Sequence, residues 1–359
     1  MKRILCILSS LDAGGAETFL MKVSRSLPPE RYQLDFVVSV ENGCYTQEIL
    51  DRGGRIYKIP QRTKNPIGAF RGIKSVVKNN KYDSVLKLGE HSLAVVDLIA
   101  AKMGGARHLA VRSCNAPTGL PWKSRVIHGL FRPILNRVAT IKLAPSDLAA
   151  QFMFGKASDV VLLNNGVDLS HFCYSLEKRI DIRNEFGIED KFVVGHVGRF
   201  HPQKNHRYLL EIFKEICNQR EDAVLLLIGT GSLEEQIRKW IEEMGLQDNV
   251  ILAGQRFDIP ALLSAMDVFL FPSLYEGMPN TVIEAQATGL PCVISDTITR
   301  GADLTGLVHY LSLKDGTKCW AAKVLSMLSE QRANTSEVIT ARGYNIKDVA
   351  ERFIKLFSD

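Results

Sequence analysis

The sequence predicts an α/β protein with two doubly wound parallel sheets, one in each half of its 359 residues. Three observations support this fold class. Short apolar runs alternate with amphipathic segments, a pattern that builds βαβ units with helices on both faces of a parallel sheet. The alternation restarts after a turn-rich Asn-Asn-Gly-Val-Asp segment at 164–168. The length suits two domains of roughly 100–200 residues each.

Each half contains five strand candidates with helical periodicity between them. In the first half, strands are expected at 3–10, 33–40, 84–88, 108–113 and 141–146, and helices at about 16–27, 66–79, 92–103 and 122–138. In the second half, strands are expected at 191–199, 223–230, 249–254, 267–271 and 291–295, and helices near 205–218, 232–243, 258–265 and 279–288. The predicted domains are residues 1–163 and 164–345.

The composition is that of a globular protein of a reducing compartment. Apolar residues make up 46% of the chain, enough for a buried core. No run reaches the roughly 18 uncharged apolar residues that a membrane span needs. The first residues favour a β-strand over a signal peptide, because Ser9, Ser10 and Asp12 interrupt a short apolar stretch. The seven cysteines lack CxxC spacing, so a cytoplasmic location is expected.

The net charge of +6 is unevenly distributed. Residues 1–163 contain 24 Lys and Arg against 12 Asp and Glu, whereas the remainder contains 21 against 27. Residues 98–146 contain eight basic residues and no acidic one. A half this basic predicts an anionic partner, such as nucleic acid, acidic lipid or a phosphorylated substrate.

Ligands of open α/β sheets bind beyond the carboxyl ends of the strands, so the loops there are the first candidates for a site. The loop at 9–19 contains Gly14 and Gly15 directly before a predicted helix. Glycines allow close approach of backbone to a ligand, and a helix N-terminus attracts an anion. The loop matches neither the dinucleotide nor the P-loop pattern. A glycine-rich turn without a ligand is the alternative.

The corresponding loop of the second half carries two cations, Arg199 and Lys204, before a helix that starts near Asn205. An arginine fork and a lysine point charge together suit the two phosphates of a nucleotide diphosphate. Solvated surface cations are the alternative. Their position directly after a strand, in an otherwise acidic half, favours the site.

Two glutamates, Glu276 and Glu284, flank a third such loop and the start of its helix. Gly277 exposes backbone N–H groups, and Pro279 suits the first turn of a helix, where the missing N–H has no partner to lose. The helix N-terminus favours an anion. Carboxylates accept hydrogen bonds from sugar hydroxyls, so the pattern fits a diphosphate flanked by polyhydroxyl rings. For one glutamate alone, a purely structural role would be the better explanation: an ordinary polar helix position for Glu284, or a charge at the helix N-terminus for Glu276.

These loops carry a resemblance that spans nearly the whole chain. The segment 276–284, EGMPNTVIE, resembles the E-x7-E motif of the retaining family 4 glycosyltransferases, and 197–205, VGRFHPQKN, resembles their G-R-x(3–4)-K-N loop. GGAE at 14–17 and NNGVD at 164–168 match the same family, in particular its bacterial capsule and exopolysaccharide transferases. The resemblance implies the GT-B fold, in which two Rossmann-like doubly wound domains face each other across a cleft. It also implies a final helix, here about 346–359, that packs back on the first domain.

The resemblance assigns roles residue by residue. The catalytic candidates are Arg199, Lys204 and Glu276. Arg199 and Lys204 would stabilise the leaving diphosphate, and Glu276 would hold the sugar. Glu284 would hold the ribose, and Arg256 would lie where the family usually meets the base. The remaining donor-binding candidates are Gly14, Gly15, Asn205, Gly229, Gly277, Met278, Pro279, Asn280 and Thr281. The resemblance implies no cofactor and no metal ion, and this fits the two cations and the helix N-terminus, which would neutralise the departing charge.

One departure from the family concerns a histidine that members often carry after the fifth strand of the first domain. Here that strand ends with Arg112 and Cys114 nearby. His91, after the preceding strand, is one candidate for the missing group. Arg112, as a phosphate or acceptor contact, is the other. A lone histidine is more often structural, and the choice stays open.

The segment 122–138 is a basic amphipathic helix with Trp122, Val126, Leu130 and Ile134 on one side. This pattern is typical of a surface that rests on anionic lipid. The apolar side is expected to pack on the sheet, with the cations outside. Pro133 predicts a kink or a break.

The sequence therefore predicts a transferase that moves a hexose or N-acetylhexosamine from a nucleotide diphosphate sugar, expected to be a UDP-sugar, to a glycan or lipid-linked glycan. Such an enzyme would serve capsule or exopolysaccharide biosynthesis, peripherally bound at the inner face of the cell membrane. A sugar-nucleotide epimerase of the same fold and a non-catalytic sugar-nucleotide binding protein are the alternatives. Nucleic acid is not expected, because aromatic side chains do not alternate with the basic ones as stacking requires.

Overall fold

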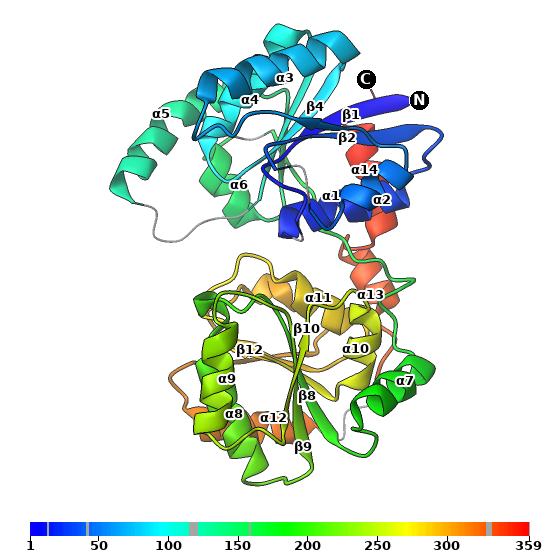
Figure 1. Ribbon diagram of the computed structural model, residues 1–359, viewed down its shortest axis with the longest axis vertical. Coiled ribbons are helices and arrows are strands. Elements are labelled where there is room, and N and C mark those ends of the chain that lie inside the picture. The colour runs from blue at the N-terminus through cyan, green and yellow to red at the C-terminus, as the bar shows by residue number, and fades with distance from the viewer. Residues whose placement is uncertain (13, 41–42, 115–120, 158, 328–331, 359) are drawn as a thin grey trace. The chain divides into compact units, whose positions relative to one another are not determined.

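The computed structural model describes residues 1–12, 14–40, 43–114, 121–157, 159–327 and 332–358. The chain forms two compact units (Figure 1). Unit 1 comprises Met1–Gly166 and Gly343–Asp359, and unit 2 comprises Val167–Arg342. The division thus falls three residues after the predicted one at 163, and the chain re-enters unit 1 three residues before residue 346.

Unit 1 is built on a seven-stranded sheet with the order β3-β2-β1-β4-β5-β6-β7, and every pairing is parallel. Its strands are β1 (Lys2–Ile7), β2 (Tyr32–Val38), β3 (Ile56–Lys58), β4 (Ser84–Gly89), β5 (His108–Ser113), β6 (Ile141–Ala144) and β7 (Val160–Leu162). Its helices are α1 (Gly15–Ser26), α2 (Thr46–Asp51), α3 (Pro66–Asn80), η1 (Ser92–Ala94), α4 (Val95–Gly104), α5 (Trp122–Val138), α6 (Asp147–Phe154) and α14 (Ile346–Lys355).

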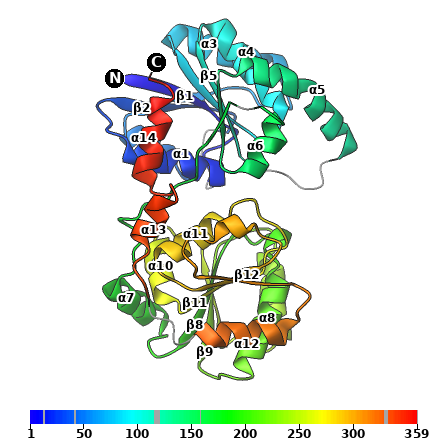
Figure 2. The same cartoon turned by 180° about the vertical axis from the view of Figure 1, so that it is seen from behind.

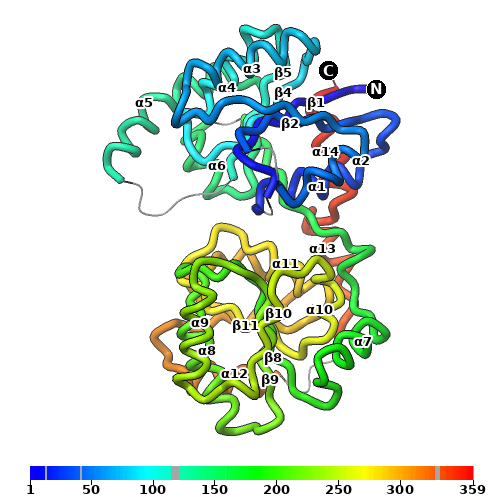
Figure 3. The backbone as a smooth tube through the Cα atoms, viewed as in Figure 1, coloured from blue at the N-terminus to red at the C-terminus, as the bar shows by residue number. Residues whose placement is uncertain are grey.

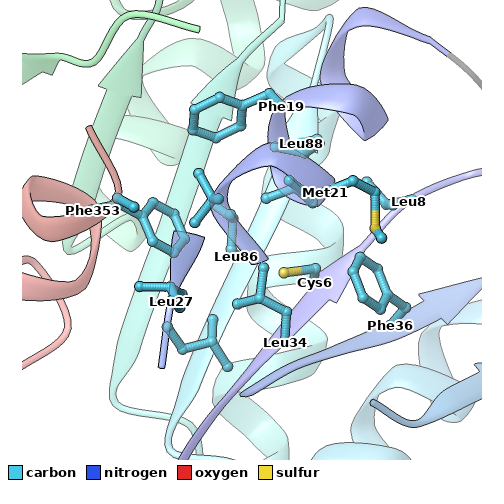
Figure 4. Packing of buried hydrophobic residues seen from close by; sticks show 14 of the residues in the cluster. Cys6, Leu8, Phe19, Met21, Leu27, Leu34, Phe36, Leu86, Leu88 and Phe353 are labelled. Carbon is cyan, nitrogen blue, oxygen red and sulfur yellow. The ribbon is translucent and has the colours of Figure 1, made fainter. Parts of the chain in front are cut away.

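Helices cover both faces of this sheet because alternate strand residues point to opposite sides. In β1, Ile4 and Cys6 join a core shared with α1 and α14, whereas Leu5 and Ile7 join a core shared with α3 and α4. Figure 4 shows the first of these cores, with Phe353 of α14 beside Phe19 of α1. Their rings meet edge to face with centroids 6.3 Å apart. The last helix of the chain is therefore part of the core of unit 1 (Figures 2 and 3).

Unit 2 repeats the plan with a six-stranded sheet of order β10-β9-β8-β11-β12-β13, again parallel throughout. Its strands are β8 (Phe192–Val197), β9 (Ala223–Ile228), β10 (Val250–Gly254), β11 (Val268–Phe271), β12 (Cys292–Ser295) and β13 (Val308–Leu311). Its helices are α7 (Leu176–Phe186), η2 (Pro202–Lys204), α8 (His206–Cys217), α9 (Glu234–Glu243), α10 (Ile259–Ala265), α11 (Asn280–Ala287), η3 (Arg300–Ala302), α12 (Thr317–Ser326) and α13 (Ser336–Ala341).

The predicted fold class, two doubly wound parallel α/β units, is confirmed. All ten predicted strands are present, and the sheets add β3, β7 and β13 at their edges. Edge strands of three or four residues carry too short an apolar run to stand out in a sequence.

The structure differs from the prediction for helix α5 in two respects. Its apolar side does not pack on the sheet: Trp122 is 67% exposed and Leu130 66%, and Val126 and Ile134 are exposed as well. The predicted break at Pro133 is absent, since the helix continues to Val138. Pro133 is exposed, so water can satisfy the carbonyl that its missing N–H leaves without a partner.

No helix in the described parts of the chain is both long enough and apolar enough to cross a membrane. Most of α5 nevertheless lies at the surface. Of its seventeen residues, only His128 and Leu135 are buried, and Figures 1 and 2 show its N-terminal part projecting from the body of unit 1.

Candidate active site

Three loops of unit 2 converge because they leave neighbouring strands at the same edge. The order β9-β8-β11 places the loops after these strands side by side, and parallel strands end at one edge of the sheet. Arg199 follows β8, Gly229 follows β9, and Glu276 lies in the loop after β11. The fold therefore gathers the residues that the sequence singled out in this half.

An ion pair joins two of these loops. The Lys204 Nζ atom lies 2.6 Å from Glu276 Oε1, and the two side chains are only 16% and 10% exposed. The same ammonium lies over the ring of Phe271, 4.5 Å from its centroid. A partly buried charge is stable only when it is paired, so each side chain fixes the position of the other.

Hydrogen bonds hold the two loops together on either side of the ion pair. The side chain of Gln203 donates from Nε2 to the backbone carbonyl of Tyr275 at 2.8 Å. The backbone carbonyl of Gln203 accepts from the N–H of Leu274 at 2.9 Å. Asn205 donates from Nδ2 to the carbonyl of Pro272 at 3.2 Å. Asn205 has a φ of +57°, a left-handed conformation that asparagine tolerates better than most residues. Lys204 is therefore placed by a tight, well-bonded turn.

The loops after β8 and β9 lie against each other through backbone atoms, at glycines of the loop after β9. A Cβ atom on Gly229, whose φ is +141°, would lie 2.1 Å from the carbonyl oxygen of Gly198. One on Gly231 would lie 2.4 Å from the carbonyl oxygen of Phe200. No side chain fits at either position, so the two loops approach as closely as backbone allows.

Helix α11 starts directly after the loop that carries Glu276. Gly277, Met278, Asn280 and Thr281 are half-buried and Pro279 is buried. The Thr281 hydroxyl is buried and makes no hydrogen bond within the residues described. Glu284 lies one turn into the helix and is 8% exposed. The first turn of a helix adds backbone N–H donors and the positive end of its dipole.

Arg199 lies at the surface beside this arrangement and makes no ion pair with any described residue. Arg199 and Lys204 bring two positive charges to this region, and Glu276 and Glu284 bring two negative ones. Arg199, which makes no described ion pair, and the N–H donors of the α11 N-terminus are the groups that attract an anion such as a diphosphate.

Arg256, expected near the base, is held by two carboxylates. Its Nη1 lies 2.5 Å from Glu185 Oε1, and its Nε lies 2.8 Å from Asp258 Oδ1. Both carboxylates stabilise the guanidinium and raise its pKa far above the ordinary value. The side chain is a quarter exposed, and a contact with the base stays a prediction.

Gly14 and Gly15 lie in unit 1, where the sequence places them, between β1 and the first turn of α1. Gly14 precedes the helix, and its N–H donates to the carbonyl of Asp12 at 2.7 Å. A Cβ atom on Gly14 would lie 2.3 Å from the carboxylate of Glu17. The glycine thus leaves room for this acidic side chain to reach back over the helix start.

Both candidates for the missing family histidine serve contacts within unit 1. His91 accepts from the N–H of Leu93 through Nδ1 and donates to the carbonyl of Ser124 through Nε2, at 3.2 and 3.0 Å. Arg112 is buried, donates to Asn165 Oδ1 at 2.6 Å and stacks 3.8 Å above the ring of Phe19. Burial lowers the pKa of Arg112 to about 10. Neither contact identifies which of the two meets a substrate.

A buried histidine pair near Lys204 was missed by sequence reasoning. His196 of β8 donates from Nδ1 to the carbonyl of Leu270 at 2.9 Å and stacks on Phe271, the ring under Lys204. His206, at the start of α8, meets His196 edge to face with centroids 5.1 Å apart. Burial and the Lys204 ammonium lower the pKa of His206 to about 4, and burial holds the pKa of His196 well below its usual range.

This pair predicts that unit 2 loses stability in mild acid. The pKa of His206 is lower in the folded chain than its unfolded value of about 6.5, so stability is complete above that pH and falls as the pH approaches 4. Between pH 7 and pH 5, His206 alone should cost about 2 kcal/mol of unfolding free energy. Urea unfolding followed by tryptophan fluorescence measures this difference. It should shrink in His206→Gln and persist in the control His171→Gln, whose ring is exposed; an unchanged difference in His206→Gln would refute the assignment.

Comparison with known proteins shows which family this chain belongs to. Residues 178–305 match the glycosyl transferases group 1. The chain is 32% identical to the putative glycosyltransferase EpsF of Bacillus subtilis over 373 residues, which cover 99% of this chain and 96% of that protein. The chain belongs to the group 1 glycosyltransferases. It is therefore an enzyme that acts on nucleotide sugars, as predicted, rather than an epimerase or a binding protein.

Two further relatives extend the comparison of this glycosyltransferase. The UDP-Gal:α-D-GlcNAc-diphosphoundecaprenol α-1,3-galactosyltransferase of Escherichia coli is 28% identical, over 79% of this chain and 76% of its own. The solved structure of Anabaena HepE in complex with UDP matches with a TM-score of 0.80 and 19% identity, over the whole of both chains. At this identity the structural match shows the shared GT-B fold of the glycosyltransferase.

Proposed function

We propose that this glycosyltransferase moves a hexose or N-acetylhexosamine from a UDP-sugar to a lipid-linked glycan, with retention of anomeric configuration, in capsule or exopolysaccharide biosynthesis. The proposal is supported by the E. coli relative, which is named for a UDP-sugar donor and a diphosphoundecaprenol-linked acceptor. The name of EpsF and the UDP bound to HepE agree with it.

The observation that carries the proposal is the Lys204–Glu276 pair beside Arg199 and the start of α11. As the bond from the sugar to the diphosphate breaks, negative charge grows on the leaving phosphate. Lys204 and Arg199 would neutralise this charge, and the backbone N–H groups of residues 277, 278, 280 and 281 would bind the phosphate oxygens. Glu276 would hold the sugar hydroxyls and Glu284 the ribose. We propose that this charge is sufficient without a metal ion.

We also propose that the enzyme works at the cytoplasmic face of the membrane, held by α5. The exposed apolar stripe Trp122, Val126, Leu130 and Ile134 runs along the helix, and basic residues flank it. A helix with these two features lies in the interface of an anionic bilayer.

Incubation with a panel of nucleotide sugars, with and without lipid-linked acceptor, tests the proposed reaction. We expect UDP release to be fastest with one UDP-sugar and to increase with the acceptor, and chelation of divalent metal to leave the rate unchanged. Proton NMR of the first product should show the anomeric configuration of the donor. An inverted product, or a rate abolished by the chelator and restored by metal, would contradict the proposal.

A further inference from the structure

A pocket opens on unit 1 between α5 and α6, and the ring of His91 lies beside the His128 that lines it, with centroids 4.8 Å apart. Its volume is about 410 Å³. The residues that line it are Arg125, His128, Gly129, Arg132, Leu148, Gln151 and Phe152. No role considered so far involves this pocket.

The floor of the pocket is a rigid structure built on His128. Its Nδ1 accepts from the N–H of Ser92 at 3.1 Å, and its Nε2 donates to the carbonyl of Phe152 at 2.9 Å. The imidazole also stacks on the ring of Phe152, with centroids 4.5 Å apart and an interplanar angle of 13°. Three elements, η1, α5 and α6, are thereby joined at the pocket.

The two cations of the pocket have no carboxylate partner. Arg125 and Arg132 are seven residues apart, which puts them on one face of α5, two turns from each other. Neither guanidinium makes an ion pair or hydrogen bond among the described residues, and the whole stretch 98–146 lacks acidic residues. Two unpaired guanidiniums favour an anion that can accept several hydrogen bonds.

Gly129 keeps the space between the arginines open. It lies one turn from each of them, and a Cβ atom built on it would meet no other atom within 4 Å. Glycine in a helix interior costs about 1 kcal/mol relative to alanine, and here no crowding requires it. The vacant position is therefore part of the pocket.

Exposed apolar side chains lie on both helices of the pocket: Leu148 of α6 lines it, and Val126 and Leu130 belong to the exposed stripe of α5. Leu148 is 56% exposed, Val126 is 53% exposed and Leu130 is 66% exposed. An aqueous anion would gain nothing from these side chains, whereas an anion attached to acyl chains would place the chains against them. The two cations of the pocket and the exposed apolar side chains beside it together favour a ligand with an anionic headgroup and acyl chains.

We infer that the α5–α6 pocket binds the phosphate headgroup of an anionic membrane lipid, with its acyl chains beside the exposed stripe of α5. Two guanidiniums match the two charges of a phosphomonoester better than the single charge of a phosphodiester. The inference rests on the proposed membrane association and adds to it a site with headgroup preference.

Vesicle flotation separates this site from general attraction to a charged surface. Vesicles of phosphatidic acid and of phosphatidylglycerol are matched in surface charge, and neutral phosphatidylcholine vesicles serve as the blank. The wild-type enzyme should bind phosphatidic acid about tenfold more tightly than phosphatidylglycerol, because at equal surface charge only the fit of the headgroup to the two guanidiniums differs. Equal binding to both would overturn the site but leave membrane association intact, and binding to neither would overturn both.

Three variants locate the preference. Arg125→Gln/Arg132→Gln should lose it, and Gly129→Leu, which fills the pocket and keeps every charge, should lose it too. Lys123→Gln/Arg137→Gln removes two charges from α5 outside the pocket, so binding should weaken equally on both vesicles and the preference should remain. Circular dichroism of each variant checks the fold. A preference that survives in Gly129→Leu would overturn the lipid site.

Discussion

Replacing Glu276 by glutamine is expected to lower the rate of sugar transfer by a factor of about 10²–10³ while UDP affinity stays within a few-fold of the wild type or improves. In the structure the carboxylate is paired with Lys204 at 2.6 Å. The amide removes the charge that we assign to the sugar and at the same time frees the ammonium for phosphate. Steady-state transfer rates and calorimetry with UDP measure the two effects separately.

Glu221→Gln is the matched control, because Glu221 is an exposed carboxylate of the same unit. It should leave both quantities unchanged. A Glu276→Gln variant that lost UDP affinity and transfer by the same factor would show that Glu276 serves the nucleotide and not the sugar.

Lys204→Gln is expected to lower both UDP affinity and transfer, each by about tenfold to a hundredfold, the value of one charge-assisted hydrogen bond. The loss has two causes. A cation disappears from the phosphate site, and Glu276 remains there as an unpaired, half-buried negative charge. Exposed Lys239, changed to glutamine, is the control and should have no effect.

The double variant Lys204→Gln/Glu276→Gln separates these causes. Since it removes the unpaired carboxylate, it should bind UDP more tightly than Lys204→Gln alone, while transfer stays as low as in Glu276→Gln. Strictly additive losses of UDP affinity would show that the ion pair does not couple the two residues.

Much of the unit 2 arrangement followed from where parallel strands end. Arg199, Lys204 and Glu276 each come shortly after a predicted strand, and the sheet order brings their loops together. The 2.6 Å contact between Lys204 and Glu276 could not be predicted from the sequence, because these residues are 72 positions apart and only the tertiary structure brings them together. The His196–His206 pair was missed for a related reason: a neutral histidine in an apolar strand shows no periodic signal.

Helix α5 shows a limit of hydrophobic periodicity. The spacing of Trp122, Val126, Leu130 and Ile134 predicted the helix correctly over 122–138. Periodicity identifies an apolar side but not what covers it, and the assumption that the sheet covers it was wrong. The side that faces unit 1 instead uses His128 and Leu135, a pair too sparse to recognise in advance.

The central claim is that unit 2 binds the diphosphate of the donor through Lys204, Arg199 and the start of α11. Calorimetry with UDP and with uridine, on the wild type and on Lys204→Gln and Arg199→Ala, tests it most directly. We expect UDP to bind far more tightly than uridine, and each variant to weaken UDP binding but leave uridine binding unchanged. Variants that bind UDP as the wild type does, or that lose uridine and UDP equally, would contradict it.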